Sequence, residues 1–278
     1  MVARNMTNVL RNGGRRASKV VNETNGENGE MKILILDIET APNLGYVWGL
    51  WDQNLGLSQV VDFSQVICFA ARWYGDKKVH FHSDYHDGHT EMVKAAWALM
   101  DEAHAVVHYN GKAFDIKHLN REFLLAGLNP PRPHKDIDLL HAARSNFKFP
   151  SNKLDHVSQA LGVGSKVKHE GMELWLACMR GEKAAWARMK AYNIGDITIT
   201  EGVYEIMRPW IKQHPHVGMY TGDLESCPKC GSKKLQRRGF ARTLSQVYQQ
   251  YQCKNCGGYC RDKGPLPETR TLTRNVSN

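Results

Sequence analysis

The pattern of apolar and polar positions is regular from Met31 to about Trp210 and predicts alternating strands and helices. Short apolar runs bounded by Gly, Asn and Asp are typical of strands, whereas apolar residues three and four positions apart indicate helices. Strands are expected at 32–38, 65–74, 78–83, 105–109 and around Ile137. Helices are expected at 90–103, 114–126, 139–145, 154–161, 172–179, 182–189 and 192–207. An early hairpin at Gly75-Asp76 followed by alternating helices and strands predicts an α/β layer fold with a mixed sheet.

The two ends of the chain depart from this pattern. The N-terminal stretch is polar and rich in Asn and Gly, without a helical or strand period, which predicts a flexible tail. Arg208-Pro209 is expected to close the last long helix, because proline cannot continue it. The expected division is a tail at 1–30, a main domain at 31–212, a linker at 213–224, a Cys-rich module at 225–262 and a second flexible tail at 263–278.

Composition places the chain among ordinary globular proteins, with 42% hydrophobic and 23% charged residues. No run approaches the roughly 20 apolar residues that span a bilayer, so no membrane association is expected. The first 30 residues lack the apolar segment of a secretory signal. Their Arg and Ser content is also compatible with a transit peptide, but three Glu residues and the absence of an apolar face argue against one. A cytoplasmic protein is therefore expected.

The net charge of +9 is concentrated at one end of the chain. Residues 221–278 contain 11 Lys and Arg against 4 Asp and Glu, whereas residues 31–220 contain 21 of each kind. A basic module attached to a neutral body is typical of proteins that bind nucleic acid. A solvated charged tail would produce the same excess, and charge alone does not separate the two interpretations.

Acidic residues in three separated patches are the strongest candidates for chemistry. Asp37 and Glu39 end a predicted strand two positions apart, so both carboxylates share one face of the sheet. Like charges so close are costly without a cation between them, and oxygen ligands suit Mg²⁺ or Mn²⁺. Asp115 lies near the start of a helix, where stabilisation by the helix dipole is the alternative role. Tyr192 and Asp196 share a helix face, although a core Tyr beside an exposed Asp is the alternative.

Together these patches resemble the DEDD superfamily of 3′–5′ exonucleases, which share the ribonuclease-H-like fold. The motifs that carry the resemblance are Asp-x-Glu at 37–39, Asn-x₃-Phe-Asp at 110–115 and Tyr-x₃-Asp at 192–196. Tyr192 places the resemblance in the DEDDy branch, because the DEDDh branch would have His where Ala191 stands. The resemblance covers about residues 31–210, and the stretches DIETAPN, SNKLDHVSQALGVGSK, HEGMELW and YNIGD are similar to those of phage and bacterial exonucleases of this group.

The resemblance implies a two-metal hydrolysis of nucleic acid from its 3′ end, with DNA favoured over RNA, in a bacterial or phage-infected cell. It implies two Mg²⁺ or Mn²⁺ ions about 4 Å apart, and the implied ligands are Asp37, Glu39, Asp115 and Asp196. Tyr192 would orient the attacking water, and the products would be nucleoside 5′-monophosphates. Contacts to the terminal nucleotide are implied for Thr40, Asn110 and Phe114. Phe114 is equally suited to the core, and replication or repair proteins are the partners such an enzyme would have.

Other polar residues are weaker candidates. Asp136 and Asp138 flank the predicted strand at Ile137, where a supporting contact to the site or a helix-cap role is expected. Lys153 and Lys166 could contact phosphate, but solvated lysines are the more common case.

The C-terminal module contains the pattern CxxC-x₂₂-CxxC, formed by Cys227, Cys230, Cys253 and Cys256. Paired CxxC motifs in a chain without a signal peptide favour a metal over disulfides, and four thiolates at this spacing suit one structural Zn²⁺. The segment between the pairs predicts a β-hairpin, and with its basic and aromatic residues it looks like a zinc ribbon. Arg237 and Arg238 are its candidate phosphate contacts. A ribbon that only stabilises itself or docks on the main domain remains an alternative, and Cys260 is either a spare thiol or a replacement for Cys256.

The sequence therefore predicts a metal-dependent 3′–5′ exonuclease with a C-terminal zinc ribbon. A structure-specific endonuclease on the same fold is one alternative, because a fold does not determine an activity. A catalytically silent nucleic-acid-binding protein is the other, although the intact acidic set argues against it.

Overall fold

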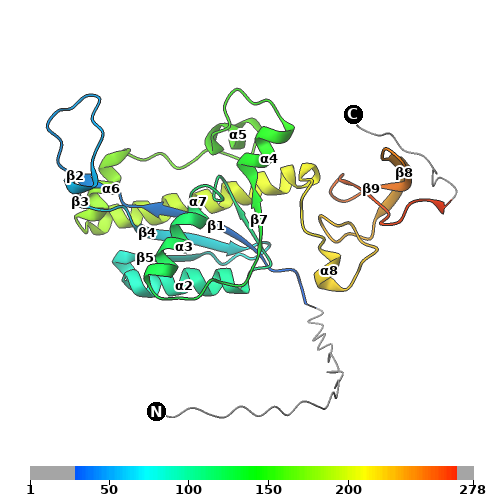
Figure 1. The fold of residues 1–278 in the computed structure, drawn as a ribbon, viewed down its shortest axis with the longest axis horizontal. Helices are drawn as coiled ribbons and strands as arrows, with labels where there is room; N and C mark the ends of the chain where they lie inside the picture. Colours follow the sequence, from blue (N-terminus) through cyan, green and yellow to red (C-terminus); the bar gives the residue numbers. More distant parts are fainter. Residues whose placement is uncertain (1–28, 268–278) are drawn as a thin grey trace, which may run out of the picture.

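A mixed five-stranded sheet forms the centre of the main domain in a computed structural model, which describes residues 29–267 (Figure 1). The strands are β1 (Ile33–Thr40), β4 (Val66–Trp73), β5 (His80–Ser83), β6 (Ala105–His108) and β7 (Lys135–Asp138). Their order across the sheet is β5-β4-β1-β6-β7. The β1–β4 and β4–β5 pairs are antiparallel, whereas β1–β6 and β6–β7 are parallel, which confirms the predicted mixed α/β sheet. Of the expected tails, residues 1–28 and 268–278 lie outside the described part.

Helices cover both faces of this sheet (Figure 1). They are α1 (Asp84–Asp87), α2 (His89–Glu102), α3 (Asp115–Leu125), α4 (Leu139–Asn146), α5 (Leu154–Ala160), α6 (Met172–Met179) and α7 (Lys183–Met207), followed by the 3₁₀ turn η2 (Arg208–Trp210). Most lie within a few residues of their expected positions. The two helices expected at 182–189 and 192–207 are wrong as separate elements, because α7 is continuous. Lys190-Ala191 between them contains no glycine or proline, and both residues favour helix.

The alternation of β1 decides which helices its side chains meet. Leu34 and Leu36 point to one face and pack in a core with residues of α2 and α3. Ile33 and Ile35 point to the opposite face and pack in a second core with residues of α4, α5 and α7. Because side chains repeat every two residues, the following odd positions also face α7.

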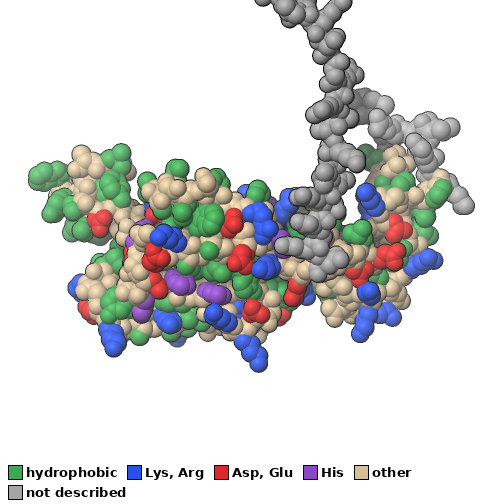
Figure 2. All heavy atoms as spheres, turned by 90° about the horizontal axis from the view of Figure 1, so that it is seen from below, with side chains coloured by type: hydrophobic (Ala, Val, Ile, Leu, Met, Phe, Trp, Pro, Cys, Tyr) green, Lys and Arg blue, Asp and Glu red, His purple; other side chains and the backbone are tan. Residues whose placement is uncertain are grey.

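A projecting arm, residues 44–63, follows β1 and was not anticipated from the sequence pattern. It contains β2 (Leu44–Gly45), η1 (Leu57–Gln59) and β3 (Val60–Asp62), and β2 pairs antiparallel with β3. Trp48 is 99% exposed and Trp51 is 84% exposed. Figure 2 shows hydrophobic side chains gathered on this arm at one end of the molecule. The arm contributes little to the core, because its large apolar side chains face outwards.

The C-terminal module is a three-stranded sheet of β8 (Leu235–Arg242), β9 (Val247–Cys253) and β10 (Tyr259–Arg261), in the order β10-β9-β8. The hairpin expected between the Cys pairs is the antiparallel β8–β9 pair. The segment assigned to a linker contains a short helix, α8 (Gly218–Thr221). It also contacts the module, since the Val217 amide donates a hydrogen bond to the Pro228 carbonyl at 2.8 Å. Among residues 29–267, no helix is long and apolar enough to cross a membrane.

His214 links α7 to this segment, and its hydrogen bonds make the stability of this contact sensitive to acid. Its Nε2 accepts a hydrogen bond from the Tyr204 hydroxyl at 2.7 Å, and its Nδ1 donates to the Pro215 carbonyl at 2.7 Å. This arrangement requires the neutral ring, and burial lowers the pKa of His214 to about 4. The unfolded chain therefore takes up the proton first, so this stability is complete above about pH 6.5 and is lost as the pH falls towards 4.

At pH 5 protonation of His214 in the unfolded chain is expected to lower the unfolding free energy by about 2 kcal/mol. Urea unfolding at pH 7.5 and pH 5 measures this loss. The variant His214→Phe, which has no titrating ring, should lose about 2 kcal/mol less than the unmodified protein between the two pH values. Equal losses in the two proteins would contradict the prediction.

Candidate functional site

The face of β1 that meets α7 carries the first two predicted acidic residues. Asp37 and Glu39 continue the odd positions of β1, and α7 presents Tyr192 and Asp196 one turn apart towards them. One carboxylate oxygen from each of Asp37, Glu39 and Asp196 lies within 4.8 Å of the others. The tertiary structure therefore brings together carboxylates that are about 160 positions apart in the sequence.

Asp115, the first residue of α3, reaches the same end of β1 from the other side. Its Oδ1 accepts a hydrogen bond from the backbone amide of Ile38 at 3.1 Å, and the side chain is buried. Ile38 lies between the Asp37 and Glu39 carboxylates in the chain, so Asp115 borders the three-carboxylate group without belonging to it. The helix-dipole role considered for Asp115 coexists with this contact, because the residue does begin α3.

The electrostatics of this group show an accumulation of negative charge in a poorly solvated place. Burial raises the pKa of Asp37 well above its ordinary value, and repulsion from Asp115, Glu39 and Asp196 adds to it. Burial and the Asp196 charge raise the pKa of Glu39 to about 8. Burial also raises the pKa of Asp115 to about 6. Such shifts mean that the ionised cluster requires a compensating cation.

Lys166 supplies one positive charge from the loop after α5. Its Nζ lies 2.6 Å from Asp196 Oδ2 and donates a hydrogen bond to the Tyr192 hydroxyl at 3.0 Å. Burial alone would lower the pKa of Lys166, but the neighbouring Asp196 carboxylate outweighs it and raises the pKa. Burial and Asp196 raise the pKa of Tyr192 to about 12, so its hydroxyl keeps its proton. The sequence suggested at most a phosphate contact for Lys166, whereas the structure places it inside the acidic group.

Asn193 is a site residue that sequence reasoning missed. It is fully buried, and its Nδ2 donates a hydrogen bond to Asp37 Oδ2 at 2.7 Å. This bond fixes the orientation of the Asp37 carboxylate. The sequence offered no signal for it, because the expected helix at 192–207 placed Asn193 in the first turn, where Asn is common.

The turn after β6 has a strained geometry that positions Asn110. Asn110 has a φ of 70°, in the left-handed region that Asn tolerates better than most residues. A Cβ at Gly111 would lie 2.4 Å from His108 Cγ, so only glycine fits there. The backbone N–H of Asn110 donates a hydrogen bond to Asp138 Oδ1 at 3.1 Å. Asp138 also accepts from the first amides of α4, which confirms its expected role as a helix cap.

The remaining candidate substrate contacts are Thr40, Phe114, Arg237 and Arg238, which lie on different elements. Thr40 follows a bulge at the end of β1 and is partly buried. Phe114 is 39% exposed and lies against His118, with ring centroids 4.5 Å apart, so it is not a core residue. Arg237 and Arg238 are exposed on β8, in the separate C-terminal sheet.

Comparison with known families identifies the main domain. A family model of the RNase_H superfamily, RNase_H_2, matches residues 34–208, which include all four acidic residues and Tyr192. The chain belongs to the RNase H superfamily. The mixed sheet flanked by helices fits this RNase H-like domain, and the family supports a metal-dependent function in nucleic-acid processing. A search of curated proteins returned no match to the sequence.

The acidic residues of the RNase H-like domain fit a divalent cation. Asp196 Oδ1 is buried and has no hydrogen-bond partner among the described residues. A buried carboxylate oxygen left without a donor is costly, and a metal ion removes that cost. Lys166 provides a single charge for a group of several carboxylates. The donor set is all oxygen, which suits Mg²⁺ or Mn²⁺ rather than softer metals.

The four cysteines of the C-terminal module form a second candidate metal site. Their sulfurs lie within 4.8 Å of one another, and the pairs Cys227–Cys256 and Cys230–Cys253 are each 3.7 Å apart. This separation is too long for a disulfide and matches the edge of a tetrahedron with Zn–S bonds of about 2.3 Å. The cluster contains Cys256, and Cys260 is not part of it. Cys68 and Cys178 belong to the apolar core.

Proposed function

We propose that this RNase H superfamily protein is a metal-dependent 3′–5′ exonuclease of the DEDDy type. It would hydrolyse terminal phosphodiester bonds of nucleic acid, with DNA favoured, to nucleoside 5′-monophosphates. The observation that carries the proposal is the meeting of Tyr192 with the carboxylates of Asp37, Glu39 and Asp196 at the end of β1. The tyrosine separates this arrangement from a generic acidic metal site.

The acidic residues would act as ligands for two Mg²⁺ or Mn²⁺ ions, namely Asp37, Glu39, Asp115 and Asp196. When bound, such ions activate a water and stabilise the charge that develops on the departing 3′ oxygen. Asn193 holds Asp37 in one rotamer through its hydrogen bond, so this ligand is oriented before substrate arrives. The protonated Tyr192 hydroxyl is available to hold the attacking water in line with the phosphorus.

The substrate would be held by contacts of different kinds. Thr40 at the end of β1 and Asn110 in the turn after the adjacent strand β6 would offer polar groups to the terminal nucleotide. The exposed ring of Phe114 is suited to stacking on the terminal base. One structural Zn²⁺ would be held by the four cysteines, and Arg237 and Arg238 on the ribbon would contact phosphates farther along the strand. Replication or repair proteins as partners and a cytoplasmic location belong to the same proposal.

A degradation assay with oligonucleotides that carry a label at one end tests this function. DNA and RNA oligonucleotides labelled at the 3′ end are incubated with the full-length chain and Mg²⁺ or Mn²⁺. Release of labelled mononucleotide as the first product, dependent on the metal, is the expected result. Internal fragments without labelled mononucleotide would establish the endonuclease instead, and intact substrate with retained binding would establish a silent nucleic-acid-binding protein.

A further inference from the structure

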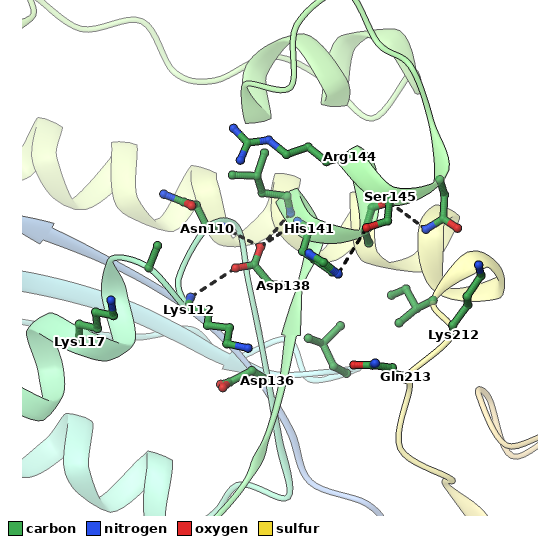
Figure 3. Close-up of a pocket in the computed structure, with 16 residues that line it drawn as sticks. Asn110, Lys112, Lys117, Asp136, Asp138, His141, Arg144, Ser145, Lys212 and Gln213 are labelled. Carbon is green, nitrogen blue, oxygen red and sulfur yellow. Dashed lines mark hydrogen bonds between the residues drawn. The ribbon is translucent and has the colours of Figure 1, made fainter. Parts of the chain in front are cut away.

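A groove of about 700 Å³ lies along the edge of the main domain at β7 and α4 (Figure 3). Its walls come from the turn after β6, the end of β7, helix α4 and the segment that follows η2. At one end are Asn110 and Ala113, which precede the acidic Asp115 by a few residues. At the other end are Lys212 and Gln213. The groove therefore begins at the turn that leads into Asp115 and ends at the segment that follows α7, and none of the four acidic residues lines it.

The charged side chains of this groove that form no ion pair are all cations. Figure 3 shows Lys112 and Lys117 towards one end, Lys212 at the opposite end and Arg144 above them. Within residues 29–267, none of these four cations forms an ion pair. Unpaired cations arranged along one depression are a surface suited to a row of phosphates.

The two carboxylates in the same groove are already engaged by the protein. Asp138 accepts backbone hydrogen bonds from Asn110 and from the start of α4. Asp136 lies 3.5 Å from the Nε2 of His108 and 3.6 Å from that of His134. The neighbouring imidazoles of His108 and His134 hold the pKa of Asp136 below its ordinary value. Both carboxylates are therefore engaged by neighbouring groups of the protein, whereas the four unpaired cations are available to an anionic ligand.

An exposed aromatic ring borders the far end of the groove. Trp210 immediately precedes the lining residue Ile211, and 57% of it is exposed. Its ring packs edge-on against Phe147 with centroids 5.3 Å apart, which holds it in place. Indole faces stack on unpaired bases, and cations beside such a face are the usual composition of a single-strand binding surface.

The module lies directly beyond this end. Lys229 of the module donates a hydrogen bond to the Pro209 carbonyl, and the Val217 amide bonds to Pro228. Trp210 and Lys212 therefore lie in the chain between two residues, Pro209 and Val217, that hydrogen-bond to the module. A strand that leaves the groove at Lys212 would therefore reach the module next.

We propose that this basic groove binds the single-stranded portion of the nucleic acid behind its 3′ end, and leads it from the acidic cluster past Trp210 to the ribbon. The cations contact the phosphates and Trp210 stacks on a base. The proposal rests on the proposed nuclease function for the direction of the strand, but the binding itself does not require cleavage.

Binding of a 5′-fluorescein dT₂₀ strand, measured by fluorescence anisotropy, tests the groove. All proteins carry Asp196→Asn to prevent degradation, and the double variant Lys112→Glu/Lys212→Glu is compared with Lys77→Glu/Lys78→Glu. The control pair is exposed in the turn before β5, outside the groove, and changes the net charge equally. We expect the groove variant to bind at least about tenfold more weakly, with the slope of log K against log salt smaller by about 1.4, and the control to change less than twofold.

The stacking role is tested with Trp210→Ala and Trp210→Phe. The alanine variant is expected to bind dT₂₀ about tenfold more weakly, and the phenylalanine variant should recover most of this loss, because a ring remains. A 20-base-pair blunt duplex should be affected far less by either substitution.

Equal affinities and salt slopes for the groove and control variants would overturn the proposal, even if the enzyme degrades DNA. An equal loss for the duplex would overturn the assignment to single strands. A weakened groove variant of a protein that shows no nuclease activity would uphold the groove and reject the proposed function alone.

Discussion

Replacing Asp196 with Asn is expected to lower metal-dependent nuclease activity by at least about 10³-fold, which corresponds to about 4 kcal/mol of lost transition-state stabilisation. The carboxylate lies within 4.8 Å of the Asp37 and Glu39 carboxylates, and its Oδ1 has no hydrogen-bond partner among the described residues. An amide of nearly the same shape keeps the packing but removes the negative charge that a divalent cation needs. Initial rates of mononucleotide release measure the loss.

The protein should remain folded, since the substitution removes a buried charge beside Asp37 and Glu39, and Lys166 keeps its hydrogen bond to the Tyr192 hydroxyl. Thermal unfolding followed by circular dichroism checks this, with a midpoint within a few degrees of that of the unmodified protein. Asp52→Asn is the matched control, because Asp52 lies exposed on the arm, and its activity should be unchanged. Substantial activity in Asp196→Asn would show that the acidic cluster is not the active site.

Replacing Cys227 with Ser is expected to abolish zinc binding and to unfold the C-terminal module. A structural zinc contributes on the order of 10 kcal/mol to a small domain. The module has few buried side chains beyond Cys227, Tyr248 and Cys253, so its own apolar core cannot replace that contribution. Metal analysis should give about one zinc per unmodified chain, and limited proteolysis should cleave the variant within 225–262 while the main domain resists.

Cys260→Ser is the control for this experiment, because Cys260 lies on β10 of the same sheet but outside the four-sulfur cluster. It should retain about one zinc and the resistance of the unmodified protein. Loss of zinc in Cys260→Ser with retention in Cys256→Ser would exchange the roles of the two cysteines. Absence of zinc from the unmodified protein would reject the ribbon as a metal site.

Local patterns were sufficient for most of the main-domain elements. The strand and helix periods located β1, β4 and α6 closely, because these segments bury one face or both in a core. They failed at the division of α7, where no residue stops the helix, and at the arm. The arm has no regular apolar period because its large side chains face mainly outwards and not into a core, so the pattern predicted no element there.

The candidate site was accessible from the sequence only in part. Asp37 and Glu39 stand two positions apart, and Tyr192 and Asp196 four apart, so their shared faces follow from local geometry. Lys166 and Asn193 could not be assigned in this way. Lys166 reaches Asp196 from a loop without regular period, and the contact of Asn193 with Asp37 depends on how α7 packs on β1.

The sequence by itself determined the chemical types and their local spacing: two acidic patches with fixed faces, a third acidic residue at a helix start, and two CxxC pairs. Those properties depend on bond geometry over a few residues. Only the tertiary structure decided that the acidic patches meet, that Lys166 enters the group, and that unpaired cations line a groove towards the module. These results depend on the packing of α7, α4 and the segment after η2 on the sheet, which is set by side chains far apart in the chain.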